Sequence, residues 1–531
     1  MTRRVWFGAA VLFAVAAGGL LPAQPPAAAP PKSGPSFIKD TAFETTCLKC
    51  HERPTDRDVT GGRNKFVLFH ESTYWEQYDL HRKAFAALDS PLGRAISTRL
   101  YRGDAKAAAA QPACLVCHST DTQPHAALSE TAAERFSTTF GVNCQACHGP
   151  AQEWWPKHIE DAVWRMTRPP DKAKLGQTDL RDPAVRATTC VECHIGSAEK
   201  GRFVTHAMYA AGHPPLPPFE LATFSRDEPR HWRPAAAVDF TGGARDEIAK
   251  QLKAPGKLKE LFHYRAGEVE AARLVAVGAV TALRESAKLV GFGPDKSGGM
   301  LDFAHFNCAA CHHELRVNGD RQKSGFPGTP GRPVPQTWPV WATRAVLRHA
   351  AAALPETAAV RDEFEKAYRE FRTVFDKAPF GDKPEAVAKA EALAVVCGEV
   401  LKALDGIEYT PAAARSLVAA LGAEANDLSR RDYLDPDGAT QLARSATVIT
   451  DELTTPPKPT PPGPQLDKPA PPPTFPNSPL RELHAAVGLT VREAEKNPLL
   501  QERGTYTDRA KRAAKYNSGD FRKLFDALTR P

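Results

Sequence analysis

The sequence predicts a mainly α-helical protein in which short helices and loops wrap around packed prosthetic groups, followed by a further helical segment. Several segments repeat apolar residues at a helical period, and we find no strand-like alternation long enough to build a sheet. The first part of the 531-residue chain is poor in long apolar runs, with Gly and Pro scattered through it. The same part contains five copies of one cysteine motif, so bound groups are expected to supply much of its core.

The repeated motif is C-x-x-C-H, the attachment signature of c-type haem. Two cysteines one helical turn apart each add to a haem vinyl group, and the histidine that follows ligates the iron. The predicted attachment residues are Cys47, Cys50, Cys114, Cys117, Cys144, Cys147, Cys190, Cys193, Cys308 and Cys311. The predicted proximal ligands are His51, His118, His148, His194 and His312. The sequence therefore predicts five covalent haem c groups and a multihaem cytochrome c fold.

Zinc sites and disulfides are the alternatives for paired cysteines. A zinc site does not need a histidine directly after the second cysteine of every pair. A disulfide scaffold is typical of short chains with irregular cysteine spacing. The motifs contain all but one of the 11 cysteines, and the remaining Cys397 lies in the apolar run Leu393–Leu404. We expect Cys397 to be a buried, inert thiol.

The second axial ligand of each iron decides between electron transfer and chemistry, because a filled position leaves no room for a substrate. The chain has four methionines but twelve histidines outside the motifs, which favours bis-histidine ligation and low reduction potentials. The candidate distal ligands are His81, His158, His206, His213 and His231. Weaker candidates are His305, His313, His125 and His70, and we expect His349 and His484 to be bystanders.

The distances between motifs along the chain predict how the haems are grouped. Successive motifs start 67, 30, 46 and 118 residues apart. The 30-residue gap predicts a close pair of haems at the second and third motifs. The 118-residue gap holds most of the candidate ligands, so this stretch is expected to fold back over earlier haems.

The chain divides into six segments. They are a signal peptide (1–23), a Pro/Ala-rich tether (24–36), a pentahaem domain (37–340), a helical segment (341–453), a Pro-rich linker (454–477) and a basic, partly helical C-terminal tail (478–531). Arg3 and Arg4 precede the apolar run Val5–Leu21, as in a secretory leader. The alternative is an uncleaved leader, which would associate the protein with the membrane. Both readings predict a periplasmic or otherwise extracytoplasmic location.

Helical periodicity predicts individual elements. The expected helices are Thr73–Leu88 and Val269–Val290 in the pentahaem domain, then Val340–Ala353, Thr357–Phe375, Pro384–Leu404 and Pro411–Asn426. The tail is interpreted as a solvated helix, with a docking segment for a partner as the alternative.

The net charge of +7 does not indicate a nucleic-acid partner. Haem propionates and ferric porphyrin cores together offset most of the charge of the chain. We see no basic patch interleaved with aromatic residues.

Several linking motifs resemble the cytochrome c554 / c-prime family of multihaem cytochromes, over roughly residues 46–341. They are Trp75 to Ala84, which contains Asp79-Leu80-His81, and Asn143–Pro150, Ala211–Pro214 and Phe219–Leu221. The resemblance implies a mainly helical, periplasmic electron carrier with closely packed, mostly bis-histidine haems. It also implies distal-ligand roles for His81, His158 and His213. This chain departs from the tetrahaem type member in its fifth haem and in the segments after Ala350.

Two functions stay open at this point. The first is electron transfer between redox protein partners, with all or nearly all irons six-coordinate. The second is a multihaem oxidoreductase that acts on a small nitrogen or sulfur compound at one five-coordinate haem, since one family haem is of that kind. Pentahaem nitrite reductases replace the motif histidine of their catalytic haem by lysine, whereas all five motifs here end in histidine. An octahaem enzyme is excluded by haem count.

A haem module docked in a larger assembly through the linker and tail is compatible with the first function. The sequence does not indicate the oligomeric state.

Overall fold

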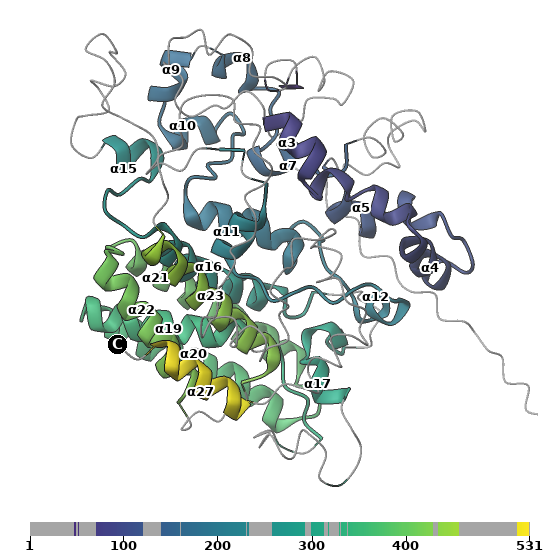
Figure 1. Ribbon diagram of the computed structural model, residues 1–531. Helices are drawn as coiled ribbons and strands as arrows, with labels where there is room; N and C mark the ends of the chain where they lie inside the picture. Colours follow the sequence, from purple (N-terminus) through teal and green to yellow (C-terminus); the bar gives the residue numbers. More distant parts are fainter. Residues whose placement is uncertain are drawn as a thin grey trace, which may run out of the picture.

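The computed structural model describes residues 47–48, 51, 71–120, 140–159, 161–229, 231–232, 257–292, 299–312, 317, 329, 331–336, 338–427, 434–455 and 518–529. These residues are mainly helical and form no strand, which confirms the predicted fold class. Their β pairing is limited to two isolated bridges, Ser197–Arg202 and Phe306–Pro335. Figure 1 shows the longer helices gathered at one side of the molecule and the short helices at the other.

The motif-bearing part consists of short helices and 3-10 turns joined by loops. Its elements are α3 (Glu71–Tyr78), η3 (His81–Lys83), η4 (Ala86–Asp89), α4 (Pro91–Leu100), η5 (Ala107–Ala110), α5 (Pro112–His118), α7 (Cys144–His148), α8 (Trp155–His158), α9 (Asp161–Met166), α10 (Pro169–Ala173), α11 (Pro183–His194), α12 (His206–Ala211), α13 (Leu221–Asp227), α15 (Lys257–Phe262), η8 (Phe303–His305) and α17 (Cys308–Cys311). Isolated helices this short are marginal in water, so they depend on packing against other parts of the protein.

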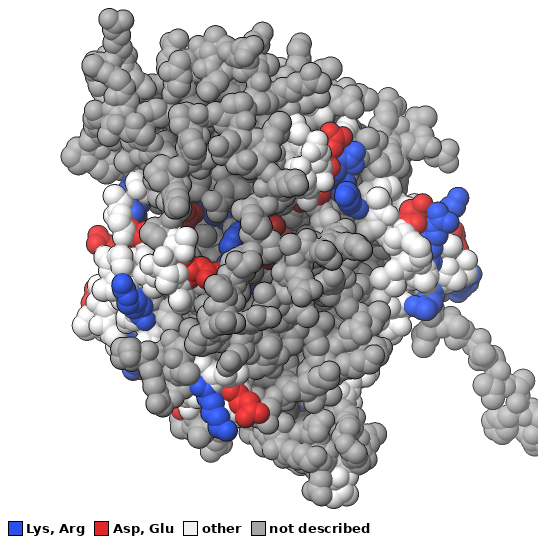
Figure 2. Space-filling model, viewed as in Figure 1, with Lys and Arg blue, Asp and Glu red and all other residues white. Residues whose placement is uncertain are grey.

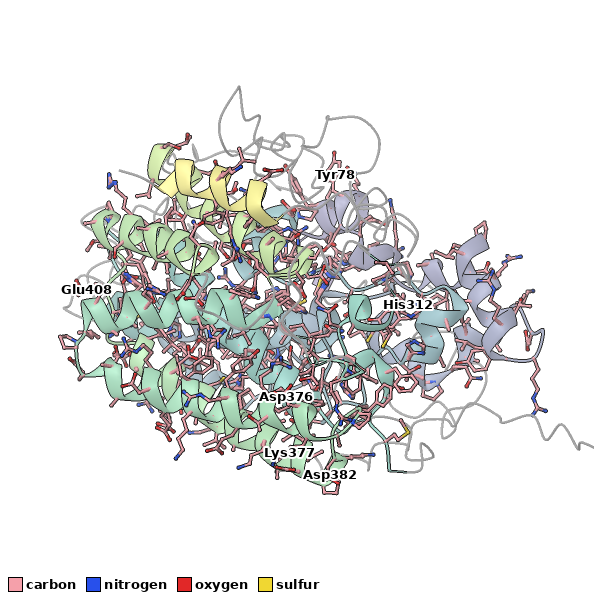
Figure 3. All side chains as sticks on the ribbon, turned by 90° about the horizontal axis from the view of Figure 1, so that it is seen from below. Tyr78, His312, Asp376, Lys377, Asp382 and Glu408 are labelled. Carbon is pink, nitrogen blue, oxygen red and sulfur yellow. The ribbon has the colours of Figure 1, made fainter. Side chains whose placement is uncertain are left out.

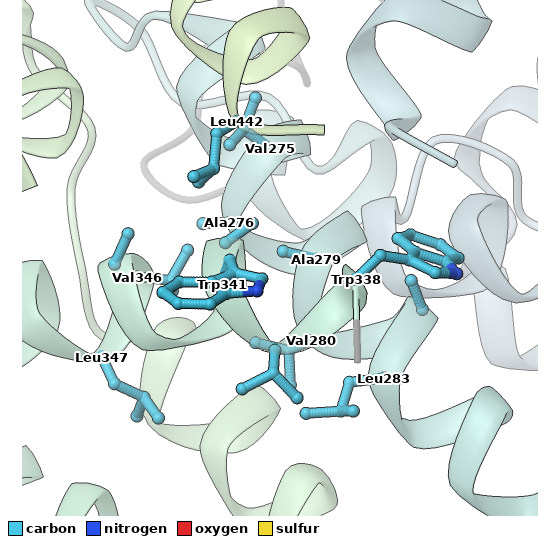
Figure 4. Packing of buried hydrophobic residues seen from close by; sticks show 14 of the residues in the cluster. Val275, Ala276, Ala279, Val280, Leu283, Trp338, Trp341, Val346, Leu347 and Leu442 are labelled. Atoms are coloured by element: carbon cyan, nitrogen blue, oxygen red, sulfur yellow. The ribbon is translucent and has the colours of Figure 1, made fainter. Parts of the chain in front are cut away.

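The longer helices form a bundle around α16 (Glu270–Leu289). They are α19 (Trp338–Ala353), α20 (Thr357–Lys377), α21 (Lys383–Leu404), α22 (Pro411–Ala425), α23 (Pro436–Thr454) and α27 (Ser518–Thr529). Helix α16 packs against α19, α21 and α23 in the bundle and against α11 and α13 in the motif-bearing part. Its side chains are buried nearly all round, as expected of an enclosed helix. Figure 4 shows the Trp341 ring of α19 among Ala276, Ala279 and Val280 of α16.

Glycine 278 allows α13 to approach α16 closely, and this contact is testable. A Cβ atom at Gly278 would lie 2.5 Å from Leu221 Cβ. We expect Gly278→Ala to lower the free energy of unfolding by about 1–3 kcal/mol, because the two helices must move apart. The control is Gly398→Ala in α21, where a Cβ meets no atom within 4 Å. Since alanine favours a helix over glycine, that variant should be about 0.5–1 kcal/mol more stable than the wild type in chemical denaturation. Equal stability losses in both variants would contradict the packing.

Five of the six predicted helices are confirmed to within two residues at each end. They correspond to α16, α19, α20, α21 and α22. The predicted helix Thr73–Leu88 is wrong, because the α-helical part ends at Tyr78 and continues as η3 and η4. The cause is Asp79, whose carboxylate accepts hydrogen bonds from the backbone N–H and the ring of His81. Side-chain acceptors of this kind compete with the backbone hydrogen bonds of the helix.

The interpretation of the tail as a solvated helix is wrong for its last helix. Helix α27 packs against α22, and Phe521 and Phe525 are fully buried. The Arg522 side chain donates from Nε to the carbonyl of Ala425 at the end of α22. This part of the tail therefore belongs to the bundle.

Several predictions lie outside the described residues. They concern the signal peptide 1–23, the tether 24–36, nearly all of the linker 454–477, most of the tail, and Cys50, His70, His125, His313 and His484. Within the described ranges, no helix combines the length and the apolar character needed to cross a membrane. Figure 2 shows Lys and Arg side chains next to Asp and Glu side chains on the described surface facing the viewer.

Candidate haem-binding sites

The described motifs lie at helix ends, where their cysteines and histidine share one face. Helix α5 ends at His118, α7 at His148 and α11 at His194, and the His312 backbone N–H continues α17 by bonding the carbonyl of Cys308. Residues three and four apart on a helix are neighbours, so both sulfur atoms and the imidazole project to the same side. This is the arrangement that haem attachment requires. Cys47 and His51 are described from the first motif.

Four motif histidines each face a second histidine from a distant part of the chain. The ring centroids are 6.4 Å apart for His51 and His158, 6.1 Å for His194 and His81, 6.3 Å for His148 and His231, and 6.3 Å for His312 and His206. Two imidazoles on opposite sides of one metal ion have centroids roughly 6 Å apart, since each metal–nitrogen bond is about 2 Å and the nitrogen lies about 1 Å from its ring centroid. The four pairs therefore fit an iron between their rings.

The Nδ1 atoms of six candidate ligands are occupied by hydrogen bonds. The acceptors are Glu71 Oε2 for His51 (3.0 Å), Asp79 Oδ1 for His81 (2.9 Å), Pro229 O for His231 (3.0 Å), Pro214 O for His213 (2.8 Å), Ala84 O for His118 (2.7 Å) and Trp155 O for His158. Since carbonyl and carboxylate oxygens accept, Nδ1 carries the proton and the Nε2 lone pair is left for a metal. These bonds also fix the ring orientation.

Two other histidines have the opposite arrangement. His305 donates from Nε2 to the carbonyl of Phe292 (2.7 Å), and His263 bonds through Nε2 to Asp179 Oδ2 (2.8 Å). Their outer ring nitrogen is therefore engaged with an acceptor instead of being presented to a metal. His349 is buried in α19, where its Nδ1 lies 3.2 Å from Ser416 Oγ. His305 and His263 thus differ from His81, His158, His213 and His231 in the ring nitrogen that is engaged, whereas His349 is set apart by its place in the bundle.

The pKa of a histidine is shifted in opposite directions in two of the four histidine pairs. Burial lowers the pKa of His148 to about 4, helped by the nearby His231, His51 and Arg181, so this imidazole is neutral at pH 7 and able to ligate. Burial also acts to lower the pKa of His81, but the hydrogen bond and charge of Asp79 outweigh it and raise the pKa to about 9. Metal binding at His81 would therefore displace a proton.

Asp79 is expected to strengthen the iron bond of His81. It is buried, and its carboxylate accepts a hydrogen bond from His81 Nδ1–H and so orients the ring. We expect Asp79→Asn to weaken axial ligation by His81 about 10- to 100-fold, as for other residues that hold a metal ligand in place. The measurement is the affinity of added imidazole for the fourth haem, followed by absorbance. The control is Asp171→Asn, which removes a carboxylate on α10 paired with Arg168 and Lys174. Equal imidazole affinities in both variants would contradict this role.

The cysteines show which motifs adjoin. Burial raises the pKa of Cys144 to about 12, and the Cys47 thiol adds to this, so the first and third motifs are neighbours. Burial also raises the pKa of Cys147, with Glu228 and Cys190 as the next causes, which places the fourth motif beside the third. A hydrogen bond between the thiols of Cys117 and Cys193 raises the pKa of Cys117 and lowers that of Cys193. The second motif therefore lies against the fourth.

A hydrogen bond between a side chain and the backbone also ties the second motif to the third. The hydroxyl of Thr120, two residues after His118, accepts from the backbone N–H of Asn143 (2.6 Å), the residue before Cys144. The predicted close pair of irons at these motifs stays a prediction, because it concerns iron positions.

The fifth motif lies between the bundle and the short helices, as Figure 3 shows for His312. Asp302 Oδ1 accepts from the backbone N–H of His206 (2.9 Å) and from Ala304 N (2.8 Å), so one carboxylate holds the candidate distal ligand and the turn before the motif. Asn307, directly before Cys308, donates to Asp435, which caps α23. The fifth site is therefore attached to both parts of the molecule.

The four ring pairs include four of the five predicted distal ligands. His213 is the fifth, and it follows α12 where Arg99 of α4 donates to the carbonyl of Ala211 (2.6 Å). Sequence reasoning missed Glu71, Asp79 and Asp302, which hold the histidines in place. The Asp79-Leu80-His81 spacing was a usable signal for Asp79, since Asp commonly bonds a backbone N–H two residues later.

Helices that present paired cysteines and a histidine on one face, with a second imidazole opposite, define a c-type cytochrome, a protein that binds covalent haem and transfers electrons. Residues 46–149 match the family described as cytochrome c554 and c-prime. This segment includes the first three motifs, and proteins of this family are typically extracytoplasmic. No curated protein and no solved structure matches the chain.

Proposed function

We propose that the protein is an extracytoplasmic electron carrier with five covalent haems, most of them low-potential and ligated by two histidines. The observation that carries this proposal is the set of four histidine pairs with ring centroids 6.1–6.4 Å apart. Each pair joins one motif histidine to one histidine chosen as a distal candidate from the sequence. Bound haem would supply a one-electron iron centre at each site.

The residues of the chain account for the other requirements of an electron carrier. At the four paired sites, two imidazoles would ligate each iron, which would leave no coordination site for a substrate there. Replacing methionine by histidine as the second ligand lowers the reduction potential. The adjoining motifs, in the order first, third, fourth and second, support a continuous array along which an electron would move.

The proposed partners are redox proteins that donate and accept electrons. The interspersed charges in Figure 2 do not favour a polyanion such as nucleic acid. The leader expected at residues 1–23 supports export, and its retention would add a membrane anchor.

Haem content and a redox titration test this function. We expect the pyridine haemochrome assay and the mass of the intact protein to give five haems per chain. Spectroelectrochemical titration should take up five electrons, mostly at negative potentials. Four or fewer haems in the fully matured protein, or a majority of potentials in the range of histidine–methionine cytochromes, would contradict the proposal.

A further inference from the structure

Arg202 lies where the second and fourth motifs meet. Its Nε donates to the carbonyl of Val116 (2.8 Å), which stands between Cys114 and Cys117. Its Nη1 donates to Glu192 Oε2 (2.7 Å), which stands between Cys190 and Cys193. One guanidinium group therefore bonds the spacer residues of two haem-binding motifs that are 76 residues apart in the sequence.

The local sequence fixes this arginine relative to the fourth motif. Helix α11 ends at His194, and the backbones of Ser197 and Arg202 then exchange two hydrogen bonds of 2.8 and 2.9 Å. The turn requires Gly196, which has φ of 140° and whose Cβ, if present, would lie 2.6 Å from the carbonyl oxygen of Arg202. The arginine is thus held by a closed loop of six residues directly after the motif.

Arg202 and Glu192 form an ion pair that is largely shielded from bulk water, and the half-exposed Lys200 at its edge gives the cluster a net positive charge. The side chains of Arg202 and Glu192 are 14% and 15% exposed. Lys200 also pairs with Glu192 (2.7 Å), so two cations share one carboxylate. The charge of Arg202 acts on the sulfur atoms of both Cys117 and Cys193, which would carry the haems. Charges act strongly on each other where water is largely excluded.

We propose that Arg202 is a positioning residue that joins the second and fourth haem motifs and raises the reduction potentials of both haems. This inference rests on the proposed function, because it requires haems at these motifs. A fixed positive charge favours the reduced iron, which has one positive charge fewer than the oxidised iron. Electrons entering the array would therefore reside preferentially at this junction.

The test is a redox titration of the five-haem protein and four variants. Arg202→Met removes the charge, and we expect two of the five reduction potentials to fall by about 59 mV. For one electron, this shift is a tenfold change in the equilibrium between oxidised and reduced iron. Arg202→Lys keeps the charge and should leave these potentials near their wild-type values. The matched control Arg94→Met removes an exposed arginine of α4 that pairs with Asp89 of η4, and it should change none of the five potentials.

Glu192→Gln provides a test of sign that leaves Arg202 in place. Removing the carboxylate increases the net positive charge, so the same two potentials should rise. If Arg202→Met does not incorporate five haems, the direction of the potential shift in Glu192→Gln tests the role of Arg202. Unchanged potentials in a fully loaded Arg202→Met, or a fall in Glu192→Gln, would overturn the role of Arg202. Neither result would touch the proposed function, whose failure would show in the wild type as missing haems.

Discussion

Replacing both cysteines of the third motif, Cys144→Ala with Cys147→Ala, should yield a protein with one haem fewer and a much lower melting temperature. The third motif adjoins the first through Cys144 and Cys47 and the fourth through Cys147 and Cys190. Cys144 also packs on the buried Trp75–Phe140 cluster. Loss of this haem would leave an unfilled space in the motif-bearing part. We expect a stability loss of at least the roughly 3–5 kcal/mol caused by truncating one large buried aromatic side chain.

Haem content by pyridine haemochrome and thermal unfolding by circular dichroism measure these effects. The control is Cys397→Ala, which removes the buried thiol outside the motifs. Burial raises the pKa of that thiol to about 12, consistent with the inert cysteine expected from the sequence. The control should keep five haems and lose far less stability. Five haems in the double variant, or equal melting temperatures in the two proteins, would show that the third motif does not hold a structural haem.

Replacing a distal histidine should convert one low-spin iron into a high-spin iron. His231→Ala is the clearest case, because its ring lies 6.3 Å from that of His148 and its Nδ1 is fixed by Pro229 O. Alanine leaves the third haem with one protein ligand, so the electron paramagnetic resonance (EPR) spectrum should gain an axial high-spin signal from one haem in five. Cyanide should then bind at that haem and restore the low-spin state.

His305→Ala is the matched control for this experiment. His305 is half-buried next to the fifth motif, but its Nε2 donates to Phe292 O. The control should lose the stabilising hydrogen bond without producing a high-spin signal. A high-spin signal in His305→Ala, or none in His231→Ala, would contradict the ligand assignment drawn from the ring nitrogens.

The attachment residues could be predicted from the sequence because the chemistry of haem attachment is local. Two thiols and an imidazole within five residues suffice, and periodicity does not need to be interpreted. The pairing of ligands could not be predicted, because the two histidines of each pair are more than 80 residues apart in the sequence. The small number of methionines favoured histidine as the distal ligand. The fold of the loops between the motifs decides which motif histidine each candidate distal histidine faces.

The same division between local and distant interactions explains the helix predictions. The long helices α16 and α19–α22 have apolar positions over several turns, and their predicted ends are accurate. The error at Thr73–Leu88 arose where one carboxylate, that of Asp79, competes with the helical hydrogen bonds. The burial of α27 was missed although Phe521 and Phe525 stand four residues apart, a spacing that places both rings on one helix face.

Spectroscopy of the oxidised wild-type protein tests the central claim most directly. Low-temperature EPR reports the spin state of each iron, and near-infrared magnetic circular dichroism identifies the axial ligand pair. With five haems per chain, we predict that at least four irons are low-spin with two histidine ligands. High-spin signals from two or more haems, or a histidine–methionine band from more than one, would show that the four histidine pairs do not hold the irons.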